Sequence, residues 1–220
     1  MRSAAAALGQ PERMESYYRL HSRVYDLTRW SFLFGRRELV AALPKALPAP
    51  RRVLEVGCGT GDNLLALSEA FPDAAVVGVD VSRAMLDVAE RKLSGRRVKL
   101  VHASYDAGFR VRRPFDLVVC SYCLTMINPG WEAVVDKAHA DLRPGGLLAV
   151  ADFHATSSRL FNRWMGFNHV RLDGQLPERL DAKFKPALCE VRPAYFGLWS
   201  YLLYLGERRP STNCANLHEF

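Results

Sequence analysis

The sequence predicts one α/β domain whose centre is a doubly wound, mostly parallel sheet of seven strands, with a helical lid at the N-terminal end. Three observations lead to this prediction. The chain of 220 residues is long enough for one such domain and too short for two. From residue 52 onward, short apolar runs alternate with helical patterns of about ten residues, as in βαβ units. A glycine-rich turn follows the first apolar run.

Five strands alternate with helices in the middle of the chain. The strands are expected at residues 53–56, 75–79, 98–102, 115–120 and 147–152, and the helices at residues 63–70, 83–93 and 131–142. Helices that connect parallel strands cover both faces of a sheet, and ligands bind at the carboxyl ends of the strands. Two aromatic runs, from Cys189 onward and over 199–204, predict an antiparallel pair that closes the sheet.

Further segments flank the alternating region. Residues 1–48 carry a helical pattern, broken near Phe34 and Gly35, and are expected to form the lid and to face a membrane. Residues 49–209 are the expected main domain, within which 155–185 form an insertion on the substrate side. Residues 210–220 are expected to be a tail.

Positive charge gathers towards both ends of the chain. Residues 1–52 carry ten Lys/Arg against four Asp/Glu, residues 53–157 carry eleven against thirteen, and residues 158–220 carry nine against six. Basic flanks favour an anionic partner, such as a membrane surface, nucleic acid or an acidic substrate, or simply a well-solvated surface. No run of about 18 apolar residues occurs, so any membrane contact is expected to be peripheral, at the inner face.

The five cysteines form no paired framework. Cys120 and Cys123 have a C-x-x-C spacing, but they follow an apolar run and lack a second ligand pair, which favours buried thiols over zinc or redox chemistry. The odd count and the lack of a signal peptide favour a cytoplasmic protein, and no metal site is expected.

The glycine turn carries the strongest functional signal. It reads Glu55-Val56-Gly57-Cys58-Gly59-Thr60-Gly61, between a strand and a helix. A helix N-terminus directs free N–H groups towards a ligand in such a turn. The spacing differs from the G-x-G-x-x-G of dinucleotide enzymes. Asp80 ends the next strand, 19 residues beyond Gly61, where a carboxylate can accept hydrogen bonds from a ribose diol.

At these residues the chain resembles the S-adenosylmethionine-dependent methyltransferases, whose E-x-G-x-G-x-G turn holds the amino-acid part of the cofactor. The resemblance spans about residues 50–152 and includes Phe115–Val119 and Leu142–Gly146. It implies a Rossmann-like methyltransferase fold, with S-adenosyl-L-methionine as cofactor and S-adenosyl-L-homocysteine as product. The residues implied as cofactor contacts are Tyr25, Glu55, Gly57, Cys58, Gly59, Gly61, Asp80, Val81, Met85, Ser104 and Ser121.

The chemistry of methyl transfer limits which acceptors are possible. The cofactor's sulfonium makes its methyl group electrophilic, so the protein mainly aligns a nucleophile, and an amine must be neutral to react. Family members that act on the amino groups of bases often carry an Asp/Asn-Pro-Pro-aromatic element after the fourth strand. Residues 121–127 lack this element, so no nucleic acid partner is expected.

The outer segments 17–29, 33–36, 121–127 and 159–165 look like those of betaine-lipid enzymes, the diacylglyceryl-homoserine N-methyltransferases. This resemblance implies an amino-lipid acceptor that is methylated up to three times at an anionic membrane surface. Candidate catalytic residues are Tyr18, Tyr122 and His154, with His154 as a proton acceptor and the aromatic rings, together with Tyr25, as a cation–π cage. Arg163 or Arg171 is the candidate for binding the head-group carboxylate, and His169 is a further candidate substrate residue.

Other interpretations stay open at this point. The aromatic residues can belong to the core, the arginines to a solvated surface, and His154 can be structural. The acceptor can be another phospholipid or an ornithine lipid, a small-molecule amine, or a quinone that is methylated on carbon. A cofactor-binding scaffold or an RNA-binding protein without methyltransferase activity is the alternative outside the enzyme class.

Overall fold

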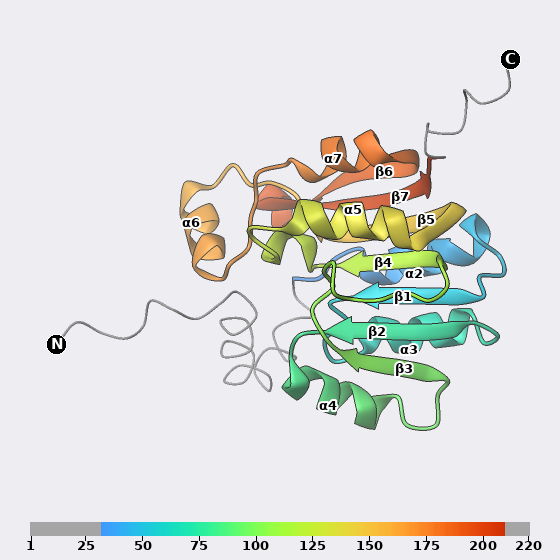
Figure 1. Cartoon of the computed structure of the whole chain (residues 1–220). Helices are drawn as coiled ribbons and strands as arrows, with labels where there is room; N and C mark the ends of the chain where they lie inside the picture. The colour runs from blue at the N-terminus through green and yellow to red at the C-terminus, as the bar shows by residue number, and fades with distance from the viewer. Residues whose placement is uncertain (1–31, 210–220) are drawn as a thin grey trace, which may run out of the picture.

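A seven-stranded sheet forms the centre of the computed structural model, which describes residues 32–209 (Figure 1). The strands lie in the order β3-β2-β1-β4-β5-β7-β6. Their bounds are β1 (Arg52–Val56), β2 (Ala75–Asp80), β3 (Val98–His102), β4 (Phe115–Ser121), β5 (Leu142–Phe153), β6 (Phe184–Ala194) and β7 (Trp199–Arg208). Only β7 runs against its neighbours. The predicted antiparallel pair at the C-terminal end of the domain is confirmed.

Helices cover both faces of the sheet, which confirms the predicted doubly wound fold. The helices α2 (Arg36–Ala46), α3 (Asp62–Ala70) and α4 (Arg83–Lys92) share one hydrophobic core with one face. The helices α5 (Trp131–Asp141) and α7 (Leu176–Lys183) pack on the other face. The helix α6 (Arg159–Phe167) lies beyond the end of the sheet to which the arrowheads of β1–β4 point (Figure 1).

Alternating side chains of the central strands supply both cores. Val53, Leu117 and Val119 belong to the core under α2–α4, whereas Leu54 and Val118 belong to the core under α5 and α7. This alternation follows from the two-residue period of a strand. Strands buried on both faces read as continuous apolar runs, which is why the sequence pattern located them.

The register of the sheet positions the site. Val56 lies opposite Val79 on one side and opposite Cys120 on the other. The next residue along each strand is therefore Gly57, Asp80 or Ser121. The residues that the sequence analysis singled out on three separate strands thus meet at one edge.

Two boundaries differ from the prediction. The strand β5 begins at Leu142 rather than at residue 147, because Leu142 pairs with Phe115 before a shift of register at Leu117. A bulge absorbs the Pro-Gly-Gly segment that looked like a loop. The strand β6 begins at Phe184 rather than at Cys189, within the expected insertion at residues 155–185, which also contains the helices α6 and α7.

Several expectations concern residues 1–31 and 210–220, which lie outside the described residues. They include the roles of Tyr18 and Tyr25, most of the lid and the C-terminal tail. Within the described part, the last helix of the expected lid, α2, packs against α3 and β5. Cys58, Cys120 and Cys123 are buried free thiols. None of the described helices is long and apolar enough to cross a membrane.

Candidate active site

The glycine turn after β1 is shaped by positive φ angles and close packing. Gly57 has φ 66°, and a Cβ atom there would lie 2.7 Å from the Cβ of Cys123. Gly61, at φ 82°, is the residue that precedes α3. Only glycine adopts these angles without strain. The amides of Gly57 and Cys58 donate to the carbonyl of Val79 at 2.8 and 3.1 Å, which holds the turn against the end of β2.

Two buried carboxylates flank this turn. Glu55 is 2% exposed and accepts a hydrogen bond from Nδ2 of Asn63 at 2.9 Å, which joins β1 to α3. Asp80 accepts from the amides of Gly59 at 2.8 Å and Ser82 at 2.9 Å. A carboxylate oxygen can accept a second hydrogen bond, so these contacts orient the Asp80 carboxylate at the position from which a ribose can be held.

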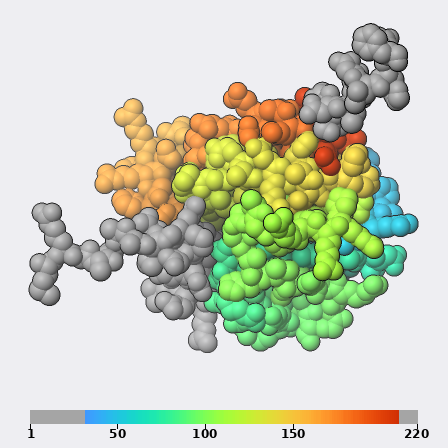
Figure 2. Space-filling model, in the orientation of Figure 1, coloured from blue at the N-terminus to red at the C-terminus, as the bar shows by residue number. Residues whose placement is uncertain are grey.

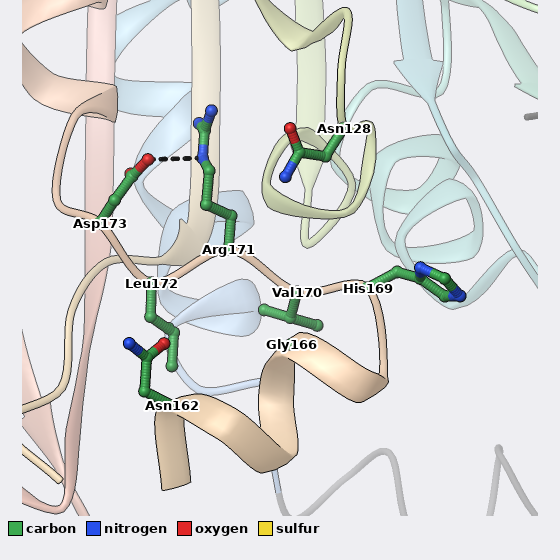
Figure 3. Close-up of a pocket in the computed structure, with 8 residues that line it drawn as sticks. All are labelled: Asn128, Asn162, Gly166, His169, Val170, Arg171, Leu172 and Asp173. Carbon is green, nitrogen blue, oxygen red and sulfur yellow. Dashed lines mark ion pairs between the residues drawn. The ribbon is translucent and has the colours of Figure 1, made fainter. Parts of the chain in front are cut away.

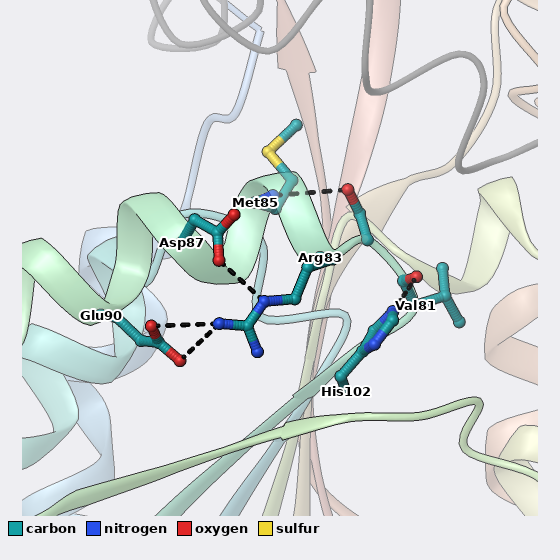
Figure 4. Close-up of polar contacts among 7 residues, drawn as sticks. Val81, Arg83, Met85, Asp87, Glu90 and His102 are labelled. Atoms are coloured by element: carbon teal, nitrogen blue, oxygen red, sulfur yellow. Dashed lines mark hydrogen bonds and ion pairs between the residues drawn. The ribbon is translucent and has the colours of Figure 1, made fainter.

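The junction of β2 and α4 is fixed by local contacts (Figure 4). The amide of Met85 donates to the hydroxyl of Ser82, which caps α4. Arg83 pairs with Asp87 at 2.8 Å and with Glu90 at 3.2 Å along the exposed side of this helix. Nε2 of His102 lies 3.0 Å from the carbonyl oxygen of Val81 and so acts as the donor. Val81, which is expected at the adenine, follows β2 directly and is also held by His102 at the end of β3.

A cavity of about 520 Å³ opens beside Asp80. Its walls are mainly apolar and come from the ends of β1 and β2, the segment after β3, the loop after β4 and one side of α5. Among the predicted cofactor residues, those that line it are Gly57, Asp80, Val81 and Ser104. An apolar cleft with a few convergent polar groups is typical of a cofactor site. The position and chemistry of this cavity fit the adenosine part of S-adenosylmethionine.

Three residues of the loop after β4 were missed by the sequence analysis. Ile127, Pro129 and Gly130 form a wall of the same cavity. Their position directly after a strand at the ligand-binding edge was the signal that could have found them. Met85 and Cys58, both predicted cofactor residues, are buried in the body of the domain.

Ser121 is the last residue of β4, and Tyr122 follows it next to the glycine turn. The hydroxyl of Ser121 is buried and has no hydrogen-bond partner among the described residues. Tyr122 has φ 53°, donates from its hydroxyl to the carbonyl of Phe34 at 2.8 Å, and packs edge-on against Phe153 at 4.7 Å. Burial raises the pKa of Tyr122 above its ordinary value. The phenol therefore stays protonated at neutral pH, and its ring is the part that can act on a ligand.

A second, polar hollow of about 350 Å³ lies between α6 and the same loop (Figure 3). It is lined by Asn128, Asn162, Gly166, His169, Val170, Arg171, Leu172 and Asp173. Asn128 stands between Ile127 and Pro129 of the first cavity, so one loop separates the two hollows. This polar hollow contains His169 and Arg171, two of the three predicted substrate residues.

Arg171 is the dominant charge in the polar hollow. Its Nε forms an ion pair with Asp173 at 2.9 Å, and its guanidinium carbon lies 4.2 Å from the ring centre of Trp131. The Nη2 nitrogen is buried and has no hydrogen-bond partner among residues 32–209. Figure 3 shows the ring of His169 pointing away from the Arg171–Asp173 pair. A buried guanidinium nitrogen requires an acceptor, and Arg171 is the arginine that lines this hollow.

Arg163 lies elsewhere. It is exposed on α6, with its guanidinium carbon 5.9 Å from the ring centre of Phe167, and it does not line the polar hollow. Binding of the head group by Arg163 remains a prediction that this arrangement does not support.

His154 follows β5 and faces the loop that carries Asp173. A Cβ atom on Gly174 would lie 3.4 Å from Cε1 of the His154 ring, so the ring packs directly on that glycine. Burial lowers the pKa of His154, and the Asp173 carboxylate opposes part of this shift. Nδ1 is buried and has no hydrogen-bond partner in the described part of the chain. A neutral imidazole of this kind can accept a proton at pH 7.

Asp152 is a buried acid that the sequence analysis did not single out. It accepts hydrogen bonds from the hydroxyl of Thr125 at 2.5 Å, the amide of Leu124 at 2.9 Å and the amide of Phe153 at 2.8 Å. Complete burial raises its pKa to about 6. Its place at the end of a strand, like that of Asp80, was the available signal. Asp152 fixes the start of the loop that separates the two hollows.

Together, the parallel sheet, the glycine turn beside an acidic strand end and the nucleoside-sized cavity define a protein of the class that binds S-adenosylmethionine. A family model described as a methyltransferase domain matches residues 53–146. The chain is 30% identical over 179 residues to a ubiquinone/menaquinone biosynthesis C-methyltransferase of Syntrophotalea carbinolica, covering 77% of this chain and 75% of that protein. The chain belongs to the S-adenosylmethionine-dependent methyltransferases.

Other relatives differ in the acceptor that their names give. A trans-aconitate 2-methyltransferase of Methylobacterium radiotolerans is 36% identical over 114 residues, which are 51% of this chain and 41% of that protein. The chain thus spans about two fifths of the length of that relative. A 1,6-didemethyltoxoflavin-N1-methyltransferase of Burkholderia thailandensis, solved with S-adenosylhomocysteine, has a TM-score of 0.67 at 21% identity and covers 94% of each chain. This structural likeness shows the fold.

Proposed function

We propose that this protein methylates the amino group of a lipid whose head group carries a carboxylate, up to three times, to give a betaine lipid of the homoserine type. The observation that carries the proposal is the buried, unpartnered Nη2 of Arg171 in the polar hollow. The reaction is expected at the inner face of a membrane, in a cytoplasmic protein that contacts the membrane peripherally.

The cofactor residues are those assembled at the end of the sheet. Asp80 would hold the ribose, Val81 and Ser104 would line the adenine, and the turn at Gly57 and Gly59 would receive the amino-acid part. When bound, S-adenosylmethionine supplies an electrophilic methyl group on a sulfonium. The chain's own contribution is then to place the acceptor nitrogen in line with that group and to exclude water.

The charges of the polar hollow complement a zwitterionic head group. The free side of the Arg171 guanidinium can hold a carboxylate, and Asp173 beside it attracts a nitrogen that becomes cationic on methylation. A quinone offers neither charge. Because the amino and carboxylate groups of homoserine share one carbon atom, the head group would bind where the loop 127–130 separates the hollow from the cofactor cavity.

His154 is proposed to accept the proton that an ammonium acceptor must lose before each transfer. Its lowered pKa keeps the ring neutral at pH 7, and its buried Nδ1 makes no hydrogen bond to a described residue. General acid–base groups must lie within hydrogen-bond reach of the proton that they move. The ring packs on Gly174, the residue after Asp173 of the polar hollow.

Aromatic rings connect the site to the surface and suit a lipid acceptor. The ring centre of Phe34 lies 5.4 Å from that of Tyr195 and 5.8 Å from that of Trp199. The ring centre of Trp199 lies 4.9 Å from that of Phe153, and the ring of Phe153 contacts Tyr122. Aromatic faces also attract a quaternary ammonium. Tyr18 and Tyr25 remain proposed members of such a cage.

A quinone C-methyltransferase is the second candidate. The similarity to the Syntrophotalea carbinolica protein, which extends over most of both chains, favours it. The aromatic path fits a prenylated quinone as well as an acyl chain. The two candidates differ in whether Arg171 contributes to recognition.

The test compares two lipid acceptors with purified protein and labelled cofactor. Arg171→Gln is expected to lower kcat/KM for diacylglyceryl-homoserine by about tenfold or more, because a charge-assisted hydrogen bond is lost, and to spare phosphatidylethanolamine, which has no carboxylate on its head group. Arg112→Gln, on an exposed loop, is the matched control. Equal loss on both lipids, or methylation of a demethylated quinone alone, would overturn the proposal.

A further inference from the structure

The exposed large hydrophobic side chains of the described residues are confined to a small part of the chain. They are Phe34, Leu160, Trp164, Phe167, Val191, Tyr195, Phe196 and Leu198. Leu160 is 83% and Phe167 72% exposed. Scattered exposed apolar residues need no explanation, but a contiguous patch marks a surface that meets a partner. We use the name docking surface for Leu160, Trp164 and Phe167 of α6 with Tyr195, Phe196 and Leu198 between β6 and β7.

The two halves of the docking surface lie together at one end of the molecule. The ring centre of Phe32 lies 6.0 Å from that of Trp164 and 6.1 Å from that of Tyr195, so Phe32 contacts both halves of the docking surface. The hydroxyl of Thr156, just before α6, donates to the carbonyl of Leu198 at 2.6 Å. Figure 2 shows α6, in orange, standing out from the body at that end.

The face that α6 turns outward is apolar. Leu160, Trp164 and Phe167 are spaced four and three residues apart and so share one side of the helix. Met165 already belongs to the core, and the partly buried Phe161 packs against it. A helix on the surface of a globular domain normally presents polar residues to water, so a second apolar face indicates a second apolar environment.

The turn between β6 and β7 displays its aromatic residues in an unusual conformation. Tyr195 and Phe196 have φ 48° and 57°, values that Asn or Gly adopt readily and bulky residues rarely. Phe196 is fully exposed, so no packing within the chain accounts for its position. Strain of this kind is retained where the surrounding structure holds it for a function.

The chain segments that carry the docking surface contain no negative formal charge. No acidic residue occurs at 154–172 or at 191–206. Arg159 and Arg163 lie one turn apart on α6, beside its apolar face. Arg192 pairs with Glu38 and Glu190. Apolar and aromatic residues flanked by arginines match the interface of a bilayer with anionic head groups.

We infer that the docking surface inserts into the interface of an anionic membrane. This insertion places the aromatic residues from Tyr195 to Trp199 at the depth of the lipid head groups. The inference rests on the proposed function in one respect: the acceptor is a membrane lipid that enters the site past these aromatic residues. It places the membrane contact on α6 and the β6–β7 turn, whereas the sequence had suggested the N-terminal segment.

The test is co-sedimentation of the full chain with vesicles of phosphatidylglycerol and phosphatidylcholine. Leu160→Glu/Phe196→Glu is expected to weaken binding by about tenfold or more, because apolar burial is lost and negative charge is added. Arg159→Glu/Arg163→Glu should also weaken it, and salt should weaken binding of the unaltered chain. Arg112→Glu/Arg113→Glu is the matched control for the arginine pair, since it makes the same change of charge just before β4, at the opposite end of the parallel strands.

Two further measurements make the outcome decisive. Calorimetry with S-adenosylhomocysteine should give the same affinity for the Leu160→Glu/Phe196→Glu variant, which shows that the domain is folded. Methylation of a short-chain, water-soluble homoserine-lipid analogue should also be unchanged. If no lipid is methylated but vesicle binding still depends on the docking surface, the proposed function is wrong, whereas the docking surface remains the membrane contact.

Other outcomes overturn the inference itself. Unaltered vesicle binding by the Leu160→Glu/Phe196→Glu variant would do so, as would absence of binding by the unaltered chain. If analytical ultracentrifugation instead shows a dimer that this variant converts to a monomer, the surface is a contact between two copies.

Discussion

The carboxylate of Asp80 accepts a hydrogen bond from the amide of Gly59 at 2.8 Å, across a separation of 21 residues. The contact joins the end of β2 to the turn after β1 and so brings together the two elements that would hold the sugar and the amino-acid part of the cofactor. The orientation of this carboxylate is set within the fold, before any ligand arrives.

Asp80→Ala is expected to weaken binding of S-adenosylhomocysteine by about ten- to a hundredfold, because hydrogen bonds to a charged group contribute roughly 1.5–3 kcal/mol. Calorimetry measures the affinity. Asp73→Ala, which alters an exposed carboxylate in the turn before β2, should leave the affinity unchanged. An Asp80→Ala protein that binds as tightly as the unaltered chain would contradict the assignment.

Gly57→Ala is expected to lower both stability and cofactor affinity. The substitution combines a positive φ of 66° with a Cβ placed 2.7 Å from the Cβ of Cys123. Gly95→Ala separates these effects, since Gly95 has φ 79° but no neighbouring atom within 4 Å. We expect Gly95→Ala to cost about 1 kcal/mol of unfolding free energy and Gly57→Ala clearly more. Denaturant titrations that give equal losses would show that the turn has room for a side chain.

Asp152→Asn should change how stability depends on pH. Burial raises the pKa of Asp152 from 3.8 to about 6, so the folded state holds a proton that the unfolded state has lost. This contribution to stability is complete below pH 3.8 and disappears as the pH rises through about 6. The difference in unfolding free energy between the two proteins should therefore shrink by about 3 kcal/mol over that window. A difference that is flat across the window would show that the carboxyl has an ordinary pKa.

At acidic pH, where this contribution is complete, Asp152→Asn should be less stable than the unaltered protein. Each oxygen of the carboxyl group accepts a hydrogen bond from a backbone amide, one from Leu124 and one from Phe153. In asparagine a nitrogen replaces one of these oxygens, and this nitrogen cannot accept a hydrogen bond. Loss of a buried hydrogen bond costs roughly 1–3 kcal/mol. Asp87→Asn, on the exposed face of α4, is the control for removing a carboxylate.

His154 should define the acidic limb of the pH–rate profile. Burial lowers its pKa below the ordinary value of about 6.5, so the ring is neutral above that pH and gains a proton as the pH falls below it. Activity on the amine acceptor should fall on the same acidic side. His154→Gln should lower kcat by about a hundredfold and remove this limb, while affinity for S-adenosylhomocysteine stays the same. A limb that survives in the variant would assign the proton transfer to another group.

The sequence predicted the fold well because the decisive signals were local. The strands at Val53 and Leu117 are mostly apolar runs, and Asp80 follows such a run directly. Gly57 and Gly61 mark backbone angles that other residues avoid, so the turn could be located from spacing alone.

The polar hollow could not be predicted in this way. Asn128, Asn162 and Arg171 meet only because α6 packs beside the loop after β4, and no local pattern encodes that contact. The period of α6 likewise marks an apolar side but does not tell whether Trp164 faces the core or the outside. Asp152 looked like the end of a strand, and its raised pKa follows from burial that only the assembled structure reveals.

The most direct test offers two membrane acceptors to the protein at once. Diacylglyceryl-homoserine and a demethylated menaquinone, present in equal amounts in the same vesicles, compete for methyl-labelled S-adenosylmethionine, and mass spectrometry locates the label. Successive addition of methyl groups to the homoserine nitrogen is the predicted result. Label found on the quinone ring, with none on the homoserine lipid, would contradict it.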